Sequence, residues 1–138
     1  MMKFKNSSFD TARLTCRRVN PSDIDELGHV NNAIYVNWIQ DAATEHWKAI
    51  AKKPLQKQYL WFCSRHEIDY RSQLFPNQKV EIRTWLGEPK GARFDRFVDI
   101  REKGGVKPAV FAKTTWVLVS IYSGKPIRIQ PEIIEAFY

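Results

Sequence analysis

Ionisable and hydrogen-bonding side chains are concentrated at the start of the segment DIDELGHVNNAIYVNWIQDAATEHWKAI, residues 23–50. The carboxylate of Asp25 can act as a general base or as a nucleophile, and the imidazole of His29 can donate or accept a proton. Asn31 and Asn32 come directly before a run with helical periodicity, where free backbone amides and the positive end of the helix dipole favour negative charge. The junction therefore combines acid–base chemistry with a place for an anion.

A long helix is predicted to follow this junction, over residues 31–50. Asn31 or Asn32 suits its N-cap, because an Asn side chain accepts hydrogen bonds from the first free amides. The basic pair at 52–53 favours the negative end of the helix, and Pro54 is expected to end it. Apolar side chains recur at the helical spacing and form a broad stripe that predicts a nearly buried helix, at positions 34, 35, 38, 39, 42, 43, 47 and 50.

The stretches around the helix are typical of β-strands. Residues 79–86 alternate cleanly, and the apolar run 109–122 predicts an interior strand. Turn-forming residues separate the runs, and short connections favour antiparallel neighbours. We therefore expect an α+β domain in which an antiparallel sheet curls around one long helix, with uncovered edges that pair with a second copy. The expected strands are residues 11–17, 61–74, 79–86, 93–102 and 109–122.

Length and composition predict a single domain over residues 1–138, with an ordinary globular balance of 43% hydrophobic and 27% charged residues. No apolar run resembles a signal peptide or a membrane span. Cys16 and Cys63 are too few for a disulfide scaffold or a zinc motif. We therefore expect reduced thiols in a cytoplasmic protein. Neither a metal-ligand cluster nor a Gly-rich dinucleotide loop is present, so no metal or cofactor is expected.

The net charge of +7 favours anionic partners, which include nucleic acid, a membrane surface and a polyanionic small molecule. The basic residues are scattered along the expected strands rather than clustered, so a simply solvated surface explains them equally well. Because they form no recognised motif or stripe, nucleic-acid binding is disfavoured. We also expect no membrane insertion.

The run DELGHVNNAIY, residues 25–35, resembles the signature of the hotdog-fold acyl-CoA thioesterases of the 4-hydroxybenzoyl-CoA thioesterase family. The tail over residues 124–134 is similar to the last strand and short final helix of that family. The resemblance implies a hotdog fold, which is an antiparallel sheet wrapped around one long central helix. It also implies hydrolysis of a fatty-acyl or aromatic-acyl thioester of coenzyme A.

The resemblance places the catalytic carboxylate at Asp25, as general base or nucleophile, and the carbonyl-polarising amide at the helix N-terminus near Asn32. Another branch of the family has His at the position of Asn32 and Asn at the position of Ile34. The role of His29 is therefore open between catalysis and loop orientation. Asp23 is expected to be structural and to bind nearby amides.

Further contacts are expected around this site and on the surface. Gly28, Asn31 and Tyr35 are expected beside the substrate, and Trp38 and Trp47 in the core. An acyl-acyl carrier protein thioesterase and a non-catalytic acyl-CoA-binding protein are the alternatives, and a homodimer or a dimer of dimers is the expected assembly. Exposed basic residues on or beside the strands are expected to meet the phosphates of coenzyme A: Lys90, Arg93, Arg96 and Lys113.

Overall fold

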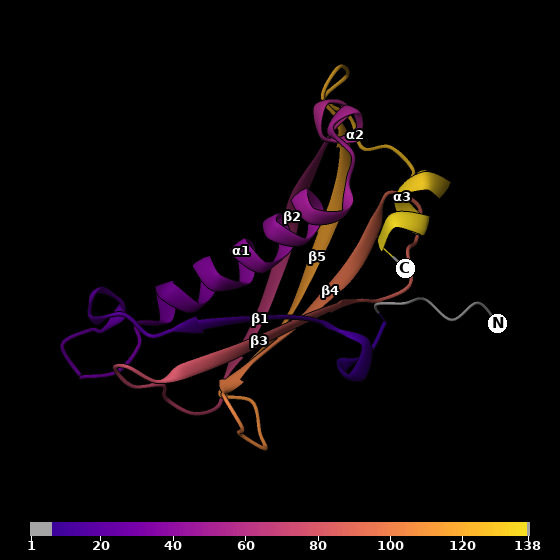
Figure 1. Ribbon diagram of the computed structural model, residues 1–138. Helices are drawn as coiled ribbons and strands as arrows, with labels where there is room; N and C mark the ends of the chain where they lie inside the picture. Colours follow the sequence, from indigo (N-terminus) through magenta and orange to yellow (C-terminus); the bar gives the residue numbers. More distant parts are fainter. Residues whose placement is uncertain (1–6, 138) are drawn as a thin grey trace.

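The computed structural model describes residues 7–137, and residues 1–6 and 138 of the predicted domain lie outside the described part. Figure 1 shows one long helix lying along one side of a twisted sheet, with the two shorter helices near one end of that sheet. The elements in chain order are η1 (Phe9–Thr11), β1 (Arg13–Arg18), η2 (Pro21–Asp23), α1 (Asn32–Ile50), α2 (Lys53–Gln58), β2 (Tyr59–Tyr70), β3 (Lys79–Leu86), β4 (Arg93–Glu102), β5 (Val110–Ser120) and α3 (Pro131–Phe137).

The five strands form one sheet in the order β1-β3-β4-β5-β2, and every pair is antiparallel. The predicted α+β class and the interior position of β5 are confirmed. The expectation that short connections join neighbouring strands is wrong for β2 and β3, because residues 71–78 carry the chain from one edge to the other half of the sheet. Eight extended residues reach roughly 26 Å, which exceeds the roughly 15 Å across three strand spacings.

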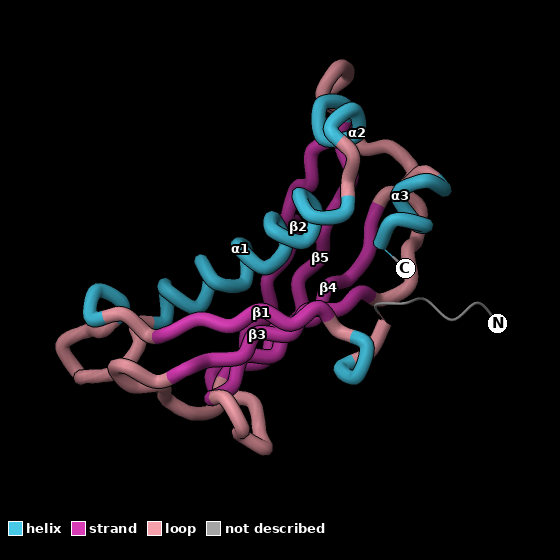
Figure 2. The backbone as a smooth tube through the Cα atoms, in the orientation of Figure 1, coloured by secondary structure: helices cyan, strands magenta, loops and turns pink. Residues whose placement is uncertain are grey.

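Figure 2 shows the helix α1 lying along one face of the sheet. Its apolar stripe is buried, as the burial of Tyr35, Trp38, Ile39, Ala42 and Ala43 shows. Trp38 is 2% exposed and packs its ring edge-to-face with Tyr35 at 5.4 Å, so its predicted core position is confirmed. The inward residues of β3 and β4, among them Ile82 and Val98, complete this core. Of the helices in the described part of the chain, none is long and apolar enough to cross a membrane.

The ends of α1 follow local chemistry. Asn31 is the N-cap, and its side-chain oxygen accepts a hydrogen bond from the amide of Ala33 at 2.9 Å. Ala51 closes the other end of the helix. Pro54 does not end α1 as predicted. It lies in the first turn of α2, where a missing amide hydrogen costs nothing and the fixed φ of proline suits a helix start.

Candidate active site

Hydrogen bonds of the backbone and of the Asp23 side chain hold the loop between β1 and α1 at both of its ends. The carboxylate of Asp23 accepts the amide of Asn20 at 2.9 Å, which confirms its predicted structural role. The carbonyl of Asp23 also accepts the amide of Asn31 at 3.0 Å, and the amide of Val30 donates to the carbonyl of Leu74 at 3.0 Å. The residues between these anchors are therefore held against the start of α1.

Within this loop, Asp25 and His29 face each other across a tight turn. The amide of Asp25 donates to the carbonyl of His29 at 3.0 Å, and Gly28 has a φ of 84°, which a residue with a Cβ rarely adopts. One carboxylate oxygen of Asp25 accepts the amide of Leu27 at 2.9 Å, and the other lies 3.7 Å from Nδ1 of His29. The side chains of Asp25 and His29 are 24% and 18% exposed, so both are largely withdrawn from water.

The first turn of α1 presents a free amide beside this pair. The amides of Ala33 and Ile34 are bonded to the side chain and the carbonyl of Asn31, respectively. Among the residues that the structure describes, the amide of Asn32 has no hydrogen-bond acceptor. It adjoins a cavity of about 330 Å³, lined by His29, Val30, Asn32, Tyr35, Tyr70, Arg71, Ser72 and Gln73. A negative oxygen placed there would meet both the free amide and the positive helix end.

The aromatic wall of this cavity comes from Tyr35, which is 3% exposed and lies 5.9 Å from the ring of Tyr70. Burial raises the pKa of the Tyr35 phenol, which therefore stays protonated. The structure thus gathers three predicted residues at one cavity, namely His29, Asn32 and Tyr35, and Asp25 lies 3.7 Å from His29 without lining the cavity. Gly28 forms the turn and Asn31 the cap, and neither lines the cavity.

Sequence reasoning missed the segment Tyr70–Gln73, which supplies half of the cavity wall. This segment begins at the last residue of β2, nearly forty residues after the junction. The strand starts beside the end of α1 and runs back along the helix, which brings the segment to the start of α1. We predicted these residues inside the strand 61–74, and the observed strand ends at Tyr70. Arg71 adds an exposed cation at this cavity that no motif indicated.

The four basic residues predicted for the phosphates do not share one environment. Lys90 and Arg93 are exposed at the turn between β3 and β4. Lys113 is exposed on β5, and its ammonium lies 3.8 Å from the carboxylate of Asp95. The prediction of an exposed Arg96 is wrong. It is 2% exposed, because residues 94, 96 and 98 of β4 all face the interior of the domain.

The buried guanidinium of Arg96 is held inside the domain by polar partners. It donates to Oγ1 of Thr84 at 2.9 Å and lies 3.1 Å from Nδ1 of His46 on α1. Because an arginine can only donate, Nδ1 of His46 is the acceptor, and this nitrogen carries no proton. Burial and the charges of Arg96 and Arg13 lower the pKa of His46 to about 3.

The pKa of His46 predicts a specific pH dependence of stability. An unfolded histidine binds a proton near pH 6.5, whereas the folded chain keeps His46 neutral down to about pH 3, so the unfolded state holds more protons between these values. The stabilisation is therefore complete above pH 6.5 and is lost as the pH falls. The free energy of unfolding should drop by up to about 1.4 kcal/mol per pH unit, measured by urea denaturation. His46→Gln, which keeps an acceptor for Arg96, should flatten this slope, and an unchanged slope would contradict the assignment.

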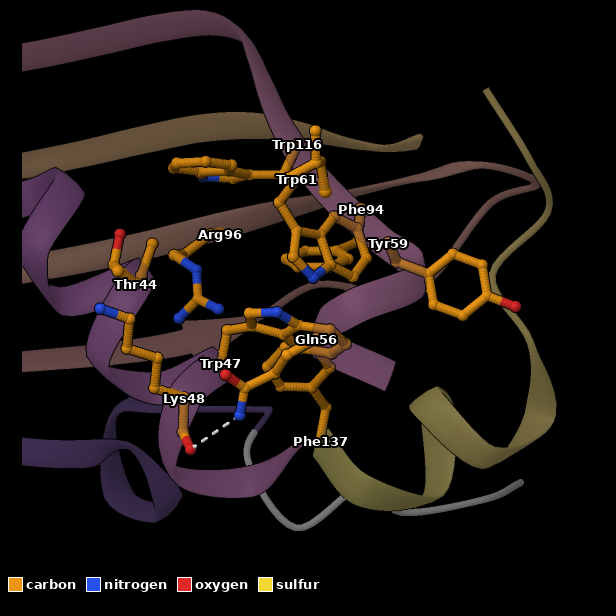
Figure 3. Close-up of a pocket in the computed structure, with 12 residues that line it drawn as sticks. Thr44, Trp47, Lys48, Gln56, Tyr59, Trp61, Phe94, Arg96, Trp116 and Phe137 are labelled. Carbon is orange, nitrogen blue, oxygen red and sulfur yellow. Dashed lines mark hydrogen bonds between the residues drawn. The ribbon is translucent and has the colours of Figure 1, made fainter. Parts of the chain in front are cut away.

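A second cavity, of about 250 Å³, lies at the other end of α1 and is shown in Figure 3. We call it the aromatic cavity. The rings of Trp47, Trp61, Phe94 and Phe137 gather on one side of it, and the guanidinium of Arg96 lies beside them. Trp47 was expected in the core, and it is in fact half-buried and lines this cavity.

Comparisons with known proteins identify the family and the fold. The family model of the thioesterase-like superfamily matches residues 19–137. Three solved structures, all described as thioesterases or probable thioesterases, share the fold. The probable thioesterase from Bartonella henselae is 22% identical, with a TM-score of 0.75, 86% of this chain covered and 99% of the other. The 1,4-dihydroxy-2-naphthoyl-CoA thioesterase from Synechocystis is 13% identical, with a TM-score of 0.79 and coverage of 91% and 95%. The probable thioesterase from Escherichia coli is 19% identical, with a TM-score of 0.77 and coverage of 90% and 97%.

The chain therefore belongs to the thioesterase-like superfamily and has its hotdog fold. As a member of that superfamily it is a thioester hydrolase. A search among curated proteins finds no sequence that matches the chain.

Proposed function

We propose that the protein hydrolyses an acyl-CoA thioester to the free acid and coenzyme A at the cavity beside the start of α1. The free amide of Asn32, which opens into the same cavity as His29, carries the proposal. The thioester carbonyl would lie with its oxygen toward this amide. Charge that develops on that oxygen would then be stabilised by the amide and by the positive end of the helix dipole.

Asp25 supplies the base or the nucleophile in this mechanism. As a base it takes a proton from water while the hydroxide oxygen bonds to the thioester carbon. As a nucleophile it forms an acyl anhydride that water then cleaves. In both routes the carbon–sulfur bond breaks, the sulfur leaves as the thiol of coenzyme A after protonation, and one water is consumed. His29 lines the cavity, and its Nδ1 lies 3.7 Å from the carboxylate of Asp25, so it can orient the carboxylate or relay the proton.

Two alternatives make different predictions in one assay. An acyl-acyl carrier protein thioesterase would favour an acidic protein carrier, which suits the net charge of +7 equally well. A non-catalytic acyl-CoA-binding protein would release no thiol. A panel of acyl-CoA and acyl-carrier-protein thioesters, followed by thiol release, distinguishes the three. Faster release from acyl-CoA supports the proposal, and release from none of the thioesters rejects it.

The exposed cations should make the reaction sensitive to salt. We propose that Lys90, Arg93 and Lys113 meet the phosphates of coenzyme A outside the cavity, because exposed ammonium and guanidinium groups bind phosphates without a dedicated loop. Salt screens such contacts, so KM for acyl-CoA should rise with ionic strength while kcat changes little. Steady-state kinetics from dilute to physiological salt measure this. A KM that does not change would show that the basic surface is not a coenzyme A site.

We also propose that the protein is a homodimer, joined through β2. This strand is at the edge of the sheet and pairs only with β5 among the described strands, so its other edge offers free amides and carbonyls. Arg65 and Glu67 place opposite charges near its middle, which suits pairing with a copy, and Leu60 and Phe62 leave 56% and 62% of their surface exposed. A dimer of dimers and a cytoplasmic location remain compatible with these features.

Light scattering at assay concentration should therefore give the mass of a dimer or a higher multiple. The change Ile68→Pro should weaken the association of the two copies and lower the measured mass. Proline removes a backbone donor and is poorly tolerated where strands pair. The matched change Val106→Pro, in the exposed turn between β4 and β5, should leave the mass unchanged. An active monomer would overturn this proposal.

A further inference from the structure

We infer that Cys63 and His66 of two copies of the chain together bind one Zn²⁺ ion on the two-fold axis of the dimer. The inference rests on the proposed dimer through β2 and goes beyond the proposed hydrolysis. The pair lies on β2 between Trp61, which lines the aromatic cavity, and Tyr70, which lines the cavity beside Asn32.

An irregularity in β2 turns these two side chains to one face of the sheet. In a regular strand, side chains three residues apart point to opposite faces. The register of β2 with β5 shifts after Cys63, so Cys63 pairs with Trp116. His66 pairs with Thr114, two positions away along β5, and both partners are buried. Because directly opposite residues of neighbouring strands share a face, the bulge brings a thiol and an imidazole together, as bulges near functional sites do.

The spacing of the two side chains fits a tetrahedral metal ion. Sγ of Cys63 lies 3.5 Å from Nε2 of His66. Zn²⁺ binds sulfur at about 2.3 Å and imidazole nitrogen at about 2.0 Å, so a tetrahedral angle places the two ligand atoms about 3.5 Å apart. Thiolate and imidazole ligands also favour Zn²⁺ over Mg²⁺ and Ca²⁺. One chain therefore presents half of a site with two cysteines and two histidines.

The second half of the site must come from another molecule. Within the described part of one chain, no group of three or more His, Cys, Asp or Glu side chains could hold a metal ion. Structural zinc sites have four ligands, so the pair alone is incomplete. Because two of the four ligands lie on a second copy, the sequence of one chain shows no zinc motif.

The charges beside the pair set the register of the two strands. A two-fold axis perpendicular to an antiparallel pair places one residue directly opposite its own copy. An axis at His66 pairs the exposed Arg65 of each copy with the exposed Glu67 of the other. An axis one residue to either side would place Arg65 or Glu67 opposite itself, and like charges in that position are destabilising. The two His66 side chains then face each other with Cβ atoms about 5 Å apart, each beside its own Cys63.

The charge of the ion is balanced by its ligands. In one chain His66 is exposed and Cys63 is half-buried. Burial raises the pKa of the Cys63 thiol, which is therefore protonated until a metal ion replaces the proton. Binding releases two protons to the solvent, one from each copy. The two thiolates then neutralise Zn²⁺, so the interface gains no buried net charge.

The stoichiometry of zinc binding is the first test. Chelator-treated protein without an affinity tag is titrated with Zn²⁺ against a chromophoric chelator, and it should bind one ion for every two chains. Co²⁺ in place of Zn²⁺ should give sulfur-to-cobalt charge-transfer absorption and the intense visible bands of a tetrahedral site. Zn²⁺ should also lower, by roughly tenfold or more, the protein concentration at which half of the dimer dissociates in light scattering, because the ion binds the dimer preferentially.

Variants identify the ligands. Cys63→Ser and His66→Gln should each weaken Zn²⁺ binding by roughly a hundredfold or more, and Cys63→Ser should remove the charge-transfer absorption. Cys16→Ser is the matched control, because it removes the other cysteine of the chain, on β1, and should keep both signals. Neither ligand lines the cavity beside Asn32, so thiol release should persist in both ligand variants.

The possible failures are distinct. Binding of one ion per chain, Co²⁺ without charge-transfer absorption, or unchanged Zn²⁺ binding by Cys63→Ser would overturn the inference. A protein that is a dimer in light scattering but binds no Zn²⁺ loses the metal site alone. A monomer with and without Zn²⁺ would overturn the dimer and the metal site together. Absence of thiol release would remove the proposed hydrolysis and leave the zinc site standing.

Discussion

Replacement of Asp25 by Asn should lower kcat by about 10² or more while KM changes little. Asparagine keeps the shape of the side chain and the acceptor for the amide of Leu27, which lies 2.9 Å from Oδ1 of Asp25. It removes the basic or nucleophilic oxygen that lies 3.7 Å from His29. Because the loop is anchored through other residues, the fold should survive, and thiol-release kinetics report the chemical step directly.

Asp41→Asn is the matched control for this experiment. Asp41 is an exposed carboxylate on α1 whose only described ion pair is with Arg17 at 3.6 Å, so its loss should leave kcat near the wild-type value. Near-normal activity of Asp25→Asn would reject the assignment. His29→Gln in the same assay separates the two roles of the imidazole, since a proton relay loses as much rate as Asp25→Asn and an orienting group loses less.

Trp38→Ala should destabilise the fold by about 3–5 kcal/mol, which is a large share of the ~5–15 kcal/mol that holds a typical domain together. Trp38 is 2% exposed, packs against Tyr35, and lies under the guanidinium of Arg17 at 4.8 Å from the ring centroid. Truncation leaves a cavity between α1 and the sheet that rigid neighbours cannot close. Urea denaturation measures the loss.

Trp85→Ala gives the comparison for a tryptophan on the other face of the sheet. Trp85 is half-buried and stacks with Phe97 at 5.8 Å. Its replacement by Ala should therefore lower the free energy of unfolding by less, below about 2 kcal/mol. Equal losses for the two variants would contradict the central position of Trp38 in the core.

Features that depend on local chemistry were predictable from the sequence. The bounds of β3 and β4 match the predicted ranges, and Asn31 caps α1 because its side chain and the adjacent apolar stripe specify a helix start together. The burial of Arg96 was also readable in principle. Arg96 alternates along β4 with Phe94 and Val98, so all three side chains lie on the buried face of the strand. The prediction failed because it assumed that an arginine must be exposed.

Features that depend on distant pairing were not predictable. The helix α2 contains six residues, too few for a periodic signal, and Pro54 suits the start of a helix as well as the end of one. No local signal states that β2 lies at the edge of the sheet farthest from β1. Arg71 lies beside Asn32, and Trp61 beside Trp47, because β2 runs back along α1.

The strand order also has a kinetic consequence. The strands β1 and β3 pair Arg18 with Lys79, and β2 and β5 pair Tyr70 with Val110, so even the nearest pairings join residues 61 and 40 positions apart. Such non-local contacts are slow to form, and a domain built on them folds in milliseconds to seconds rather than microseconds. The loop that carries Asp25 is held to Leu74 and so acquires its shape only after the chain beyond β2 has been placed. A nascent chain should therefore gain its helix early and its activity last.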